Sequence, residues 1–272
     1  MHYKTIIISD VHLGIEGSRS AELVHFLSQH TCDLLILNGD IIDAWELKKY
    51  AKWQIRHTRF FKLVFKMMQK DKTKVIYLHG NHDDFVDSII PLRMGNFSFQ
   101  MDYVLQSKDR KWYVVHGDVF DSVTKKWRWL AQIGSVLYNL LLWLNKFYNI
   151  YRKKLGLAPQ SFSYYLKTRV KSIFSRPARY EQKLLKLTRQ KECEGIICGH
   201  THKPTIKQIE EIVYMNSGDW VESLTALLED EEGNWQLYRY TDEHSLEFEK
   251  KKRKIPNEQE QDIDKIQSFF NS

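Results

Sequence analysis

Cysteine is scarce in this 272-residue sequence, and the three that are present, Cys32, Cys193 and Cys198, are not spaced as metal-binding pairs. An odd number of cysteines without CxxC or Cys/His finger spacing argues against a disulfide framework and against a structural zinc finger. We therefore expect a reducing, cytoplasmic setting. The opening stretch MHYKTIIISD has one lysine and an apolar run too short for the core of a signal peptide, so no export signal is expected.

Long uninterrupted apolar runs are also missing. The most apolar stretch, residues 130–145, is interrupted by Gln132, Ser135 and Asn139, whereas a membrane-spanning helix needs about 20 apolar residues. We expect this stretch to belong to a helical cap and not to a transmembrane helix. With 43% hydrophobic and 28% charged residues, the chain has the composition of a globular protein that can bury a sizeable core.

Acidic residues are nearly absent from one internal segment. Residues 122–192 contain 16 lysines and arginines against only Glu181 and Glu192, a net charge of +14, so the rest of the chain sums to −7 within the total of +7. The segment is also rich in aromatic residues and leucine. This combination fits a ligand with apolar chains and an anionic head at an anionic membrane surface. The alternative is that the apolar residues form the core of the cap itself.

Short β-branched runs alternate with helical patterns along the first third of the chain. Strands are predicted at 4–9, 33–39 and 74–80, and helical spacing is found at 20–30 and over about 47–69. Apolar strands of this kind are typical of a sheet that is buried on both faces. The βαβ alternation therefore predicts an α/β fold.

The later part of the chain is predicted to add strands and one insertion. Strands are predicted at 111–120, after a hairpin, and then at 194–200, 211–218, 224–230 and 234–240. Between the first of these strands and the rest lies the basic, aromatic-rich segment. We therefore expect three parts, namely a catalytic domain formed by 1–121 and 192–245, a helical cap at 122–191 and a charged tail at 246–272.

Polar clusters follow five of the predicted strands, at the place where ligand sites of α/β folds are built. The clusters are SDVH (9–12), NGDIID (38–43), GNHDD (80–84), VVHGD (114–118) and CGHTH (198–202). Asp10 and His12 are two residues apart, as are His200 and His202, and on an extended segment such a pair projects to one face. Each pair can therefore hold one ion. Asp40 can offer two carboxylate oxygens and so bridge two cations.

The candidate metal ligands combine nitrogen and oxygen donors. They are the imidazoles of His12, His116, His200 and His202, the carboxylates of Asp10 and Asp40, and the amide oxygen of Asn81. Such a set suits Mn²⁺, Fe²⁺, Zn²⁺ or Mg²⁺ and lacks the thiolates of a structural zinc site. Two divalent ions roughly 3.5–4 Å apart can generate hydroxide and hold both oxygens of an in-line displacement at phosphorus.

Further polar residues in the same clusters are expected to support the ligands. His82 can neutralise charge on a phosphate or protonate a leaving oxygen, and Asp83 is expected to orient it. Asp43 and Asp118 are interpreted as helix caps or as partners of the ligands. The remaining residues considered are His79 as a structural histidine, Asp219 and Trp220 as packing near the site, and His2, His25, His30, His57 and His244 as ordinary surface or helix residues.

The five motifs, in this order, resemble those of the calcineurin-like metallophosphoesterase superfamily. The resemblance implies a four-layer αββα sandwich with a helical cap inserted after the fourth ligand motif, and two divalent metal ions, Mn²⁺ first among the candidates. It also implies that His82 contacts the substrate phosphate. The implied ligands are Asp10, His12, Asp40 and His202 for one metal, and Asp40, Asn81, His116 and His200 for the other.

Within that superfamily, the sequence is similar to the UDP-2,3-diacylglucosamine diphosphatase group. The shared stretches are SDVHLG, NGDIIDAW, GNHDDF, VVHGDVFD, CGHTHKP and NSGDWVE, so the resemblance spans about residues 4–240. It implies hydrolysis of the pyrophosphate of UDP-2,3-diacylglucosamine in lipid A synthesis, giving the lipid 1-phosphate and UMP, by a cytoplasmic protein peripheral on the inner face of the membrane. One position differs, because the best-known enzymes of this activity have arginine where this sequence has His82.

The cap offers candidates for substrate contacts. Ser163, Lys167 and Lys171 are spaced four residues apart on one predicted helical face and could contact phosphate or sugar, although a solvated helix face is the alternative. Two other functions are considered. A phosphodiesterase acting on nucleotides or nucleic acid would also suit the +14 segment, although nucleic acid is the less favoured partner. A non-catalytic membrane-associated scaffold would have no need of a complete ligand set.

Overall fold

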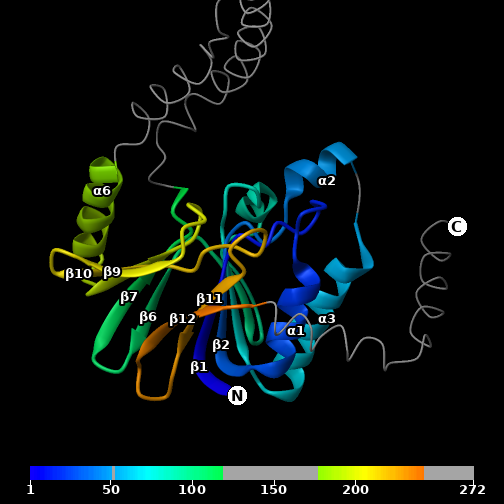
Figure 1. The fold of residues 1–272 in the computed structure, drawn as a ribbon, viewed down its shortest axis with the longest axis horizontal. Helices are drawn as coiled ribbons and strands as arrows, with labels where there is room; N and C mark the ends of the chain where they lie inside the picture. The colour runs from blue at the N-terminus through cyan, green and yellow to red at the C-terminus, as the bar shows by residue number, and fades with distance from the viewer. Residues whose placement is uncertain (51–52, 119–176, 242–272) are drawn as a thin grey trace, which may run out of the picture.

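Two β-sheets pack face to face, and helices cover the outer face of each (Figure 1). The computed structural model describes residues 1–50, 53–118 and 177–241. Helices α1 and α3 lie against the first sheet, and α6 lies against the second. The helices are α1 (Ser20–Gln29), α2 (Ala44–Tyr50), α3 (Ile55–Lys70) and α6 (Pro177–Gln190), with a 3-10 helix η1 at Asp84–Ser88. The order of layers is the αββα sandwich predicted from the sequence.

The first sheet has seven strands in the order β12-β11-β1-β2-β3-β5-β4. Strands β1, β2, β3 and β5 are parallel, while β4, β11 and β12 pair antiparallel with their neighbours. The strands are β1 (His2–Ile8), β2 (Thr31–Asn38), β3 (Lys74–Leu78), β4 (Leu92–Met94), β5 (Phe97–Gln100), β11 (Thr225–Glu229) and β12 (Trp235–Arg239). The parallel strands end at one edge of the sheet, where their connecting loops meet.

The second sheet has five strands in the order β6-β7-β8-β10-β9. Strands β7, β8 and β10 are parallel, and β6 and β9 are antiparallel edge strands. The strands are β6 (Tyr103–Ser107), β7 (Arg110–Val114), β8 (Gly195–Cys198), β9 (Thr205–Ile209) and β10 (Ile212–Asn216). The carboxyl ends of β7 and β8 bring two more of the polar clusters beside those of the first sheet.

The apolar character of β1 is explained by burial on both faces of its sheet. Ile6 and Ile8 belong to the core between the first sheet and helices α1 and α3. Ile7 points the other way, into the core between the two sheets, because successive side chains of a strand alternate. A third core contains Leu184 and Leu185 of α6, which pack against the second sheet. The run of isoleucines thus places β1 at the centre of the sandwich.

The structure differs from the sequence-based expectations in several elements. The helical span expected over about 47–69 is divided into α2 and α3, and strands β4, β5 and β9 are additional. Strand β4 has three residues, all exposed, so it carries no apolar alternation from which it could be predicted. Helix α6 falls inside the range predicted as the cap, and residues 122–176 and 246–272 lie outside the described residues. No helix in the described part of the chain is long and apolar enough to cross a membrane.

Candidate metal centre

The predicted ligands meet at one edge of the sandwich because they follow strands of the same direction. Asp10 and His12 come after β1, Asp40 after β2 and Asn81 after β3, and these three strands are parallel. His116 follows β7, and His200 and His202 follow β8, which are parallel in the second sheet. Ligand sites of α/β sheets form outside the carboxyl ends of parallel strands. The two sheets therefore contribute complementary halves of one site.

The backbone at the site adopts a conformation that the sequence-based reasoning did not include. Pairs such as Asp10 and His12 are not on an extended segment, because both residues have positive φ, at 52° and 50°. The full set of candidate ligands with positive φ is Asp10, His12, Asp40, His200 and His202. This left-handed conformation costs non-glycine residues roughly 1–2 kcal/mol each, and such strain is concentrated at functional sites. Curled loops, and not strand alternation, direct these side chains inward.

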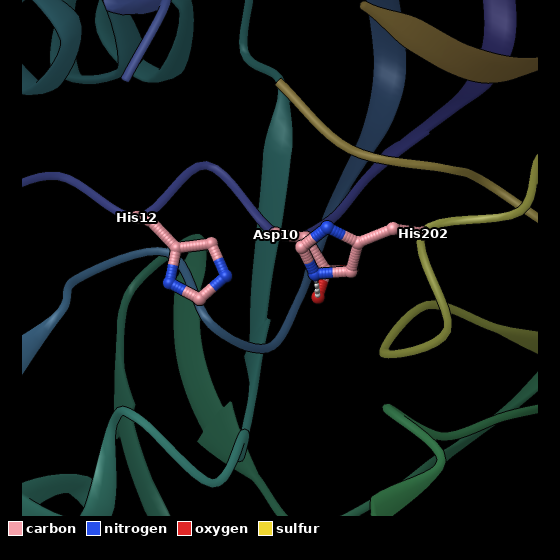
Figure 2. A group of neighbouring side chains, drawn as sticks. All are labelled: Asp10, His12 and His202. Atoms are coloured by element: carbon pink, nitrogen blue, oxygen red, sulfur yellow. Dashed lines mark ion pairs between the residues drawn. The ribbon is translucent and has the colours of Figure 1, made fainter. Parts of the chain in front are cut away.

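The first group of candidate ligands consists of Asp10, His12 and His202, each with one donor atom within 4.8 Å of the others. Figure 2 shows Asp10 and His12 on the loop after β1 and His202 on a separate loop, with an ion pair between His202 and Asp10. The distance from His202 Nε2 to Asp10 Oδ1 is 3.1 Å. Two imidazoles and a carboxylate in this arrangement can hold one divalent cation.

The second group consists of Asp40, His116 and His200, again with one donor atom each within 4.8 Å of the others. His116 Nε2 lies 3.3 Å from Asp40 Oδ2, and the rings of His116 and His200 are 5.2 Å apart. The same Asp40 Oδ2 lies 4.0 Å from His12 Nε2, which belongs to the first group. Asp40 therefore stands between the two groups, where a bridging carboxylate would be.

Buried polar atoms at this edge support the assignment to a cation site. Asn81 Oδ1 is buried and has no hydrogen-bond partner, and a buried polar atom left unpaired costs about 1–3 kcal/mol. Within the described part of the chain, Asp10 Oδ1 and His116 Nε2 also have no hydrogen-bond partner, and they lie at ion-pair distance from His202 and Asp40. Buried nitrogen and oxygen donors that converge in this way fit a divalent metal ion.

Asp10 is held by its second carboxylate oxygen, which leaves the first for the site. Asp10 Oδ2 accepts a hydrogen bond of 2.5 Å from Ser9 Oγ and one of 2.9 Å from the backbone N–H of His200. Ser9 Oγ also lies 2.7 Å from Ser217 Oγ, in the NSGDWV stretch. Neither serine was singled out by the sequence-based reasoning. The only signal is position, since Ser9 directly precedes a candidate ligand.

The buried pair of Asp40 and His116 is strongly coupled. Burial by itself would raise the pKa of Asp40. The interaction with His116, and to a smaller extent the charges of His12 and His82, instead lower this pKa below the ordinary value for an aspartate. Burial lowers the pKa of His116, yet the carboxylates of Asp40 and Asp10 raise it to about 10. Each partner thus favours the charged form of the other, and a metal ion that binds the neutral imidazole of His116 competes with a proton for it.

Metal affinity is expected to increase with pH because of these protons. His202 also has a raised pKa, through its hydrogen bond to Asp10, and a histidine must be neutral to bind a metal. Calorimetric titration with Mn²⁺ at pH 6.5, 7.5 and 8.5, in buffers of different ionisation enthalpy, should show tighter binding at higher pH together with proton release. Asp109→Asn, at an exposed residue in the turn between β6 and β7, is the control and should leave this dependence unchanged. Affinity that is independent of pH would contradict the prediction.

Asp43, and not Asp83, orients His82. Asp43 Oδ2 lies 2.9 Å from His82 Nδ1 and 3.1 Å from His12 Nδ1. Its Oδ1 accepts a hydrogen bond of 2.9 Å from the backbone N–H of Glu46 at the start of α2. Asp43 therefore acts both as a helix cap and as a partner of the site, the two roles considered from the sequence. The ring of Trp45 packs at a tilt against that of His82, with ring centroids 4.3 Å apart.

Asp83 has a different role from the one expected. Its carboxylate accepts hydrogen bonds from the backbone N–H groups of Ile41 and Ile42, at 3.0 and 2.8 Å. Burial, and then the charge of Asp40, raises the pKa of Asp83 to about 7. The backbone N–H of His82 in turn donates to Asp40 Oδ1 at 2.8 Å. These bonds fasten the loop after β3 to the loop after β2.

The other sequence-based expectations have mixed outcomes. Trp220 is fully buried against Phe26, and its backbone N–H donates to the Asp10 carbonyl, so it packs near the site as expected. Asp219 accepts bonds from backbone N–H groups of its own turn and lies 3.9 Å from His202. The buried His79 lies 2.5 Å from Asp87 and 3.7 Å from Asp118, as a structural histidine would. His25 and His57 lie on helices α1 and α3, one of the two placements expected, and His30 follows α1; all three are buried.

The candidate substrate contacts cannot be placed in this structure. Ser163, Lys167 and Lys171 lie outside the described residues, as does His244. The interpretation of the cap as a lipid-binding or membrane-binding segment falls on residues 122–176, which are also outside that part. Their roles therefore remain predictions from the sequence.

Comparison with known proteins identifies the family. A family model described as calcineurin-like phosphoesterase matches residues 3–204, which include all seven candidate ligands. The chain belongs to the calcineurin-like phosphoesterase family. As a member of this family it is a hydrolase, and the family implies divalent metal ions. The match confirms the resemblance that the five motifs indicate.

Curated relatives of this calcineurin-like phosphoesterase have a more specific name. The UDP-2,3-diacylglucosamine hydrolases of Shewanella halifaxensis and Aeromonas hydrophila are each 24% identical to it, over 82% of this chain and 93% of the relative. A solved structure of a hypothetical protein from Pyrococcus horikoshii has a TM-score of 0.45 and 12% identity, and covers 95% of this chain and 96% of that one.

Proposed function

We propose that this phosphoesterase holds two divalent metal ions and uses them to hydrolyse a phosphoester or pyrophosphate bond. The observation that carries the proposal is the position of Asp40 between two groups of ligands, Asp10, His12 and His202 on one side and His116 and His200 on the other. Asn81 supplies the remaining donor of the second group. The donor set suits Mn²⁺, with Fe²⁺, Zn²⁺ and Mg²⁺ as alternatives.

The bound ions would activate water and neutralise negative charge on the reacting phosphate. The side chains around the site orient the group that contacts the phosphate. Asp43 fixes His82 through Nδ1, so that Nε2 is the ring atom available to a phosphate oxygen. Burial lowers the pKa of His82, but its hydrogen bond to Asp43 and the nearby carboxylates raise it above the ordinary value. His82 can therefore carry a proton near neutral pH and donate it to a phosphoryl or leaving oxygen.

The substrate we propose is UDP-2,3-diacylglucosamine, cleaved at its pyrophosphate to give the lipid 1-phosphate and UMP in lipid A synthesis. The support is the name of the curated relatives, the series of shared motifs and the basic, aromatic-rich segment at 122–191. A lipid-linked substrate implies a cytoplasmic protein that is peripheral on the anionic inner face of the membrane. Polybasic segments are attracted to such a surface by about 1 kcal/mol for each lysine or arginine.

A second candidate is a phosphodiesterase that acts on nucleotides or nucleic acid. The +14 charge of residues 122–192 would also attract a polyanion, and binding of that kind weakens steeply with salt. His82, at the position where the best-known lipid-cleaving enzymes have arginine, is compatible with this alternative.

Comparison of three substrates would separate these functions. The purified full chain with Mn²⁺ is offered UDP-2,3-diacylglucosamine, the same sugar nucleotide without acyl chains, and single-stranded DNA. We expect the highest kcat/KM for the acylated substrate, because its apolar chains add binding energy. Equal values for the two sugar nucleotides would contradict the lipid assignment. Preferential cleavage of DNA with a steep salt dependence would favour the phosphodiesterase.

A further inference from the structure

A purely apolar groove lies between α3, η1 and the β4–β5 hairpin. Its walls include Phe61, Phe65 and Met68 of α3, Met94 and Phe97 of the hairpin, and Phe85 of η1, and its volume is about 350 Å³. We call this the α3 groove. Every residue that lines it is apolar or aromatic. Its volume is in the range of small-molecule pockets, which are about 300–1,000 Å³.

The mouth of the α3 groove exposes large apolar side chains to solvent. Phe65 is 53% exposed, Phe85 is 40% exposed and Met94 is 55% exposed. Large exposed apolar patches on soluble proteins mark sites of interaction with ligands, proteins or membranes. Methionine adapts its shape to irregular apolar partners, and both Met68 and Met94 line the groove. The groove is therefore open to a flexible apolar ligand.

The α3 groove shares a wall with the candidate metal centre. Ile42 lines the groove, and its backbone N–H donates to Asp83, the residue after His82, at 2.8 Å. Tyr77 also lines the groove, with its buried hydroxyl near the Asp83 carboxylate. Phe85 follows Asp83 by two residues. The segment that carries His82 and Asp83 therefore continues directly into the wall of the groove.

We infer that the α3 groove binds a hydrocarbon chain of the lipid-linked substrate, an inference that rests on the proposed function. The lining excludes a polar ligand. The Tyr77 hydroxyl, the one polar group among these side chains, is buried beside Asp83, and no lining side chain is charged. A sugar, a nucleotide or a peptide backbone would leave its hydrogen-bonding groups unpaired there. An acyl chain has none, and each methylene group removed from water favours binding.

Direct binding of a fluorescent fatty acid tests the inference without an assay of hydrolysis. The purified full chain is titrated with cis-parinaric acid, and compared with Phe65→Glu and, independently, Met94→Glu. Both side chains are more than half exposed, so a charge at the mouth of the groove should not unfold the protein, which thermal melting checks. We expect the dissociation constant of the probe to rise at least about tenfold in each variant. This is the effect of losing contact with about two methylene groups.

Ile206→Glu is the matched control, since Ile206 is an apolar residue of β9 with 39% exposure, outside the groove. It should bind the probe as the wild type does. Equal probe affinity in the wild type and both groove variants would overturn the inference. A second overturning result would come from analytical ultracentrifugation. If the wild type were a dimer and Phe65→Glu a monomer, a second copy of the chain would cover the groove.

The link to the substrate is tested by the ratio of kcat/KM for the acylated sugar nucleotide to that for the deacylated one. In Phe65→Glu this ratio should fall towards one, and an unchanged ratio would overturn the inference for the substrate chain. Failure of the proposed function gives a different result. The wild type would then hydrolyse bis-p-nitrophenyl phosphate but neither sugar nucleotide, which removes the substrate assignment and with it this use of the groove, whatever the probe titration shows.

Discussion

Asp40→Asn is expected to abolish metal-dependent hydrolysis of bis-p-nitrophenyl phosphate. The substitution preserves the shape of the side chain and the oxygen that accepts the His82 N–H. It removes the negative charge and replaces Oδ2, the oxygen that faces both ligand groups, by an amide nitrogen. The rate should fall by at least about 10²–10³-fold, which is the cost of removing one well-placed electrostatic group from an active site.

The number of bound metal ions tests whether Asp40 acts as a bridging ligand. Metal analysis of the Mn²⁺-loaded proteins should give two ions per chain in the wild type and fewer in Asp40→Asn, because a bridging ligand serves both ions. Asp109→Asn is the control, since Asp109 is exposed in the turn between β6 and β7, and it should keep the activity and the metal content of the wild type. An Asp40→Asn protein that retained both ions and a substantial activity would remove Asp40 from the bridging position.

Gly80→Ala should disrupt both the stability and the site. A Cβ atom at Gly80 would overlap the backbone nitrogen and Oδ1 of Asp40, and the backbone nitrogen cannot move aside as the end of a flexible side chain could. The loops that carry Asp40 and Asn81 would have to separate. Overpacking costs about 1–3 kcal/mol, which lowers the melting temperature of a domain of this size by several degrees, at about 2–4 °C for each kcal/mol. The activity should be lost as well.

Gly17→Ala is the matched control for this substitution. The nearest atom to a Cβ at Gly17 is Val221 Cγ1 at 3.6 Å, an ordinary van der Waals distance. This variant should melt and hydrolyse bis-p-nitrophenyl phosphate as the wild type does. Wild-type activity and melting temperature in Gly80→Ala would show that the close approach of these two loops is not needed by the site.

The sequence by itself determined the family, the sandwich fold and the residues that gather at one edge. This was possible because each motif couples a buried strand to the polar cluster that follows it. The run of isoleucines in β1, for example, indicates burial on both faces, and Asp10 comes directly after it. Since parallel strands end at the same edge, five such motifs predict that their side chains converge, and the structure brings six of the seven candidate ligands into two adjoining groups.

Only the tertiary structure decided how those side chains are held. The sequence placed Asp83 beside His82, but the fold turns Asp83 towards the backbone of Ile41 and Ile42 and brings Asp43, about 40 residues away in the chain, to His82 Nδ1. Aspartate and histidine adopt left-handed conformations more readily than most residues, but nothing in the local sequence requires them at Asp10 and His12. In the fold, the backbone N–H groups of these two residues donate to the carbonyls of Gly39 and Asp40 on the neighbouring loop. The α3 groove likewise depends on α3, η1 and β4 meeting in space, which no local pattern in the sequence specifies.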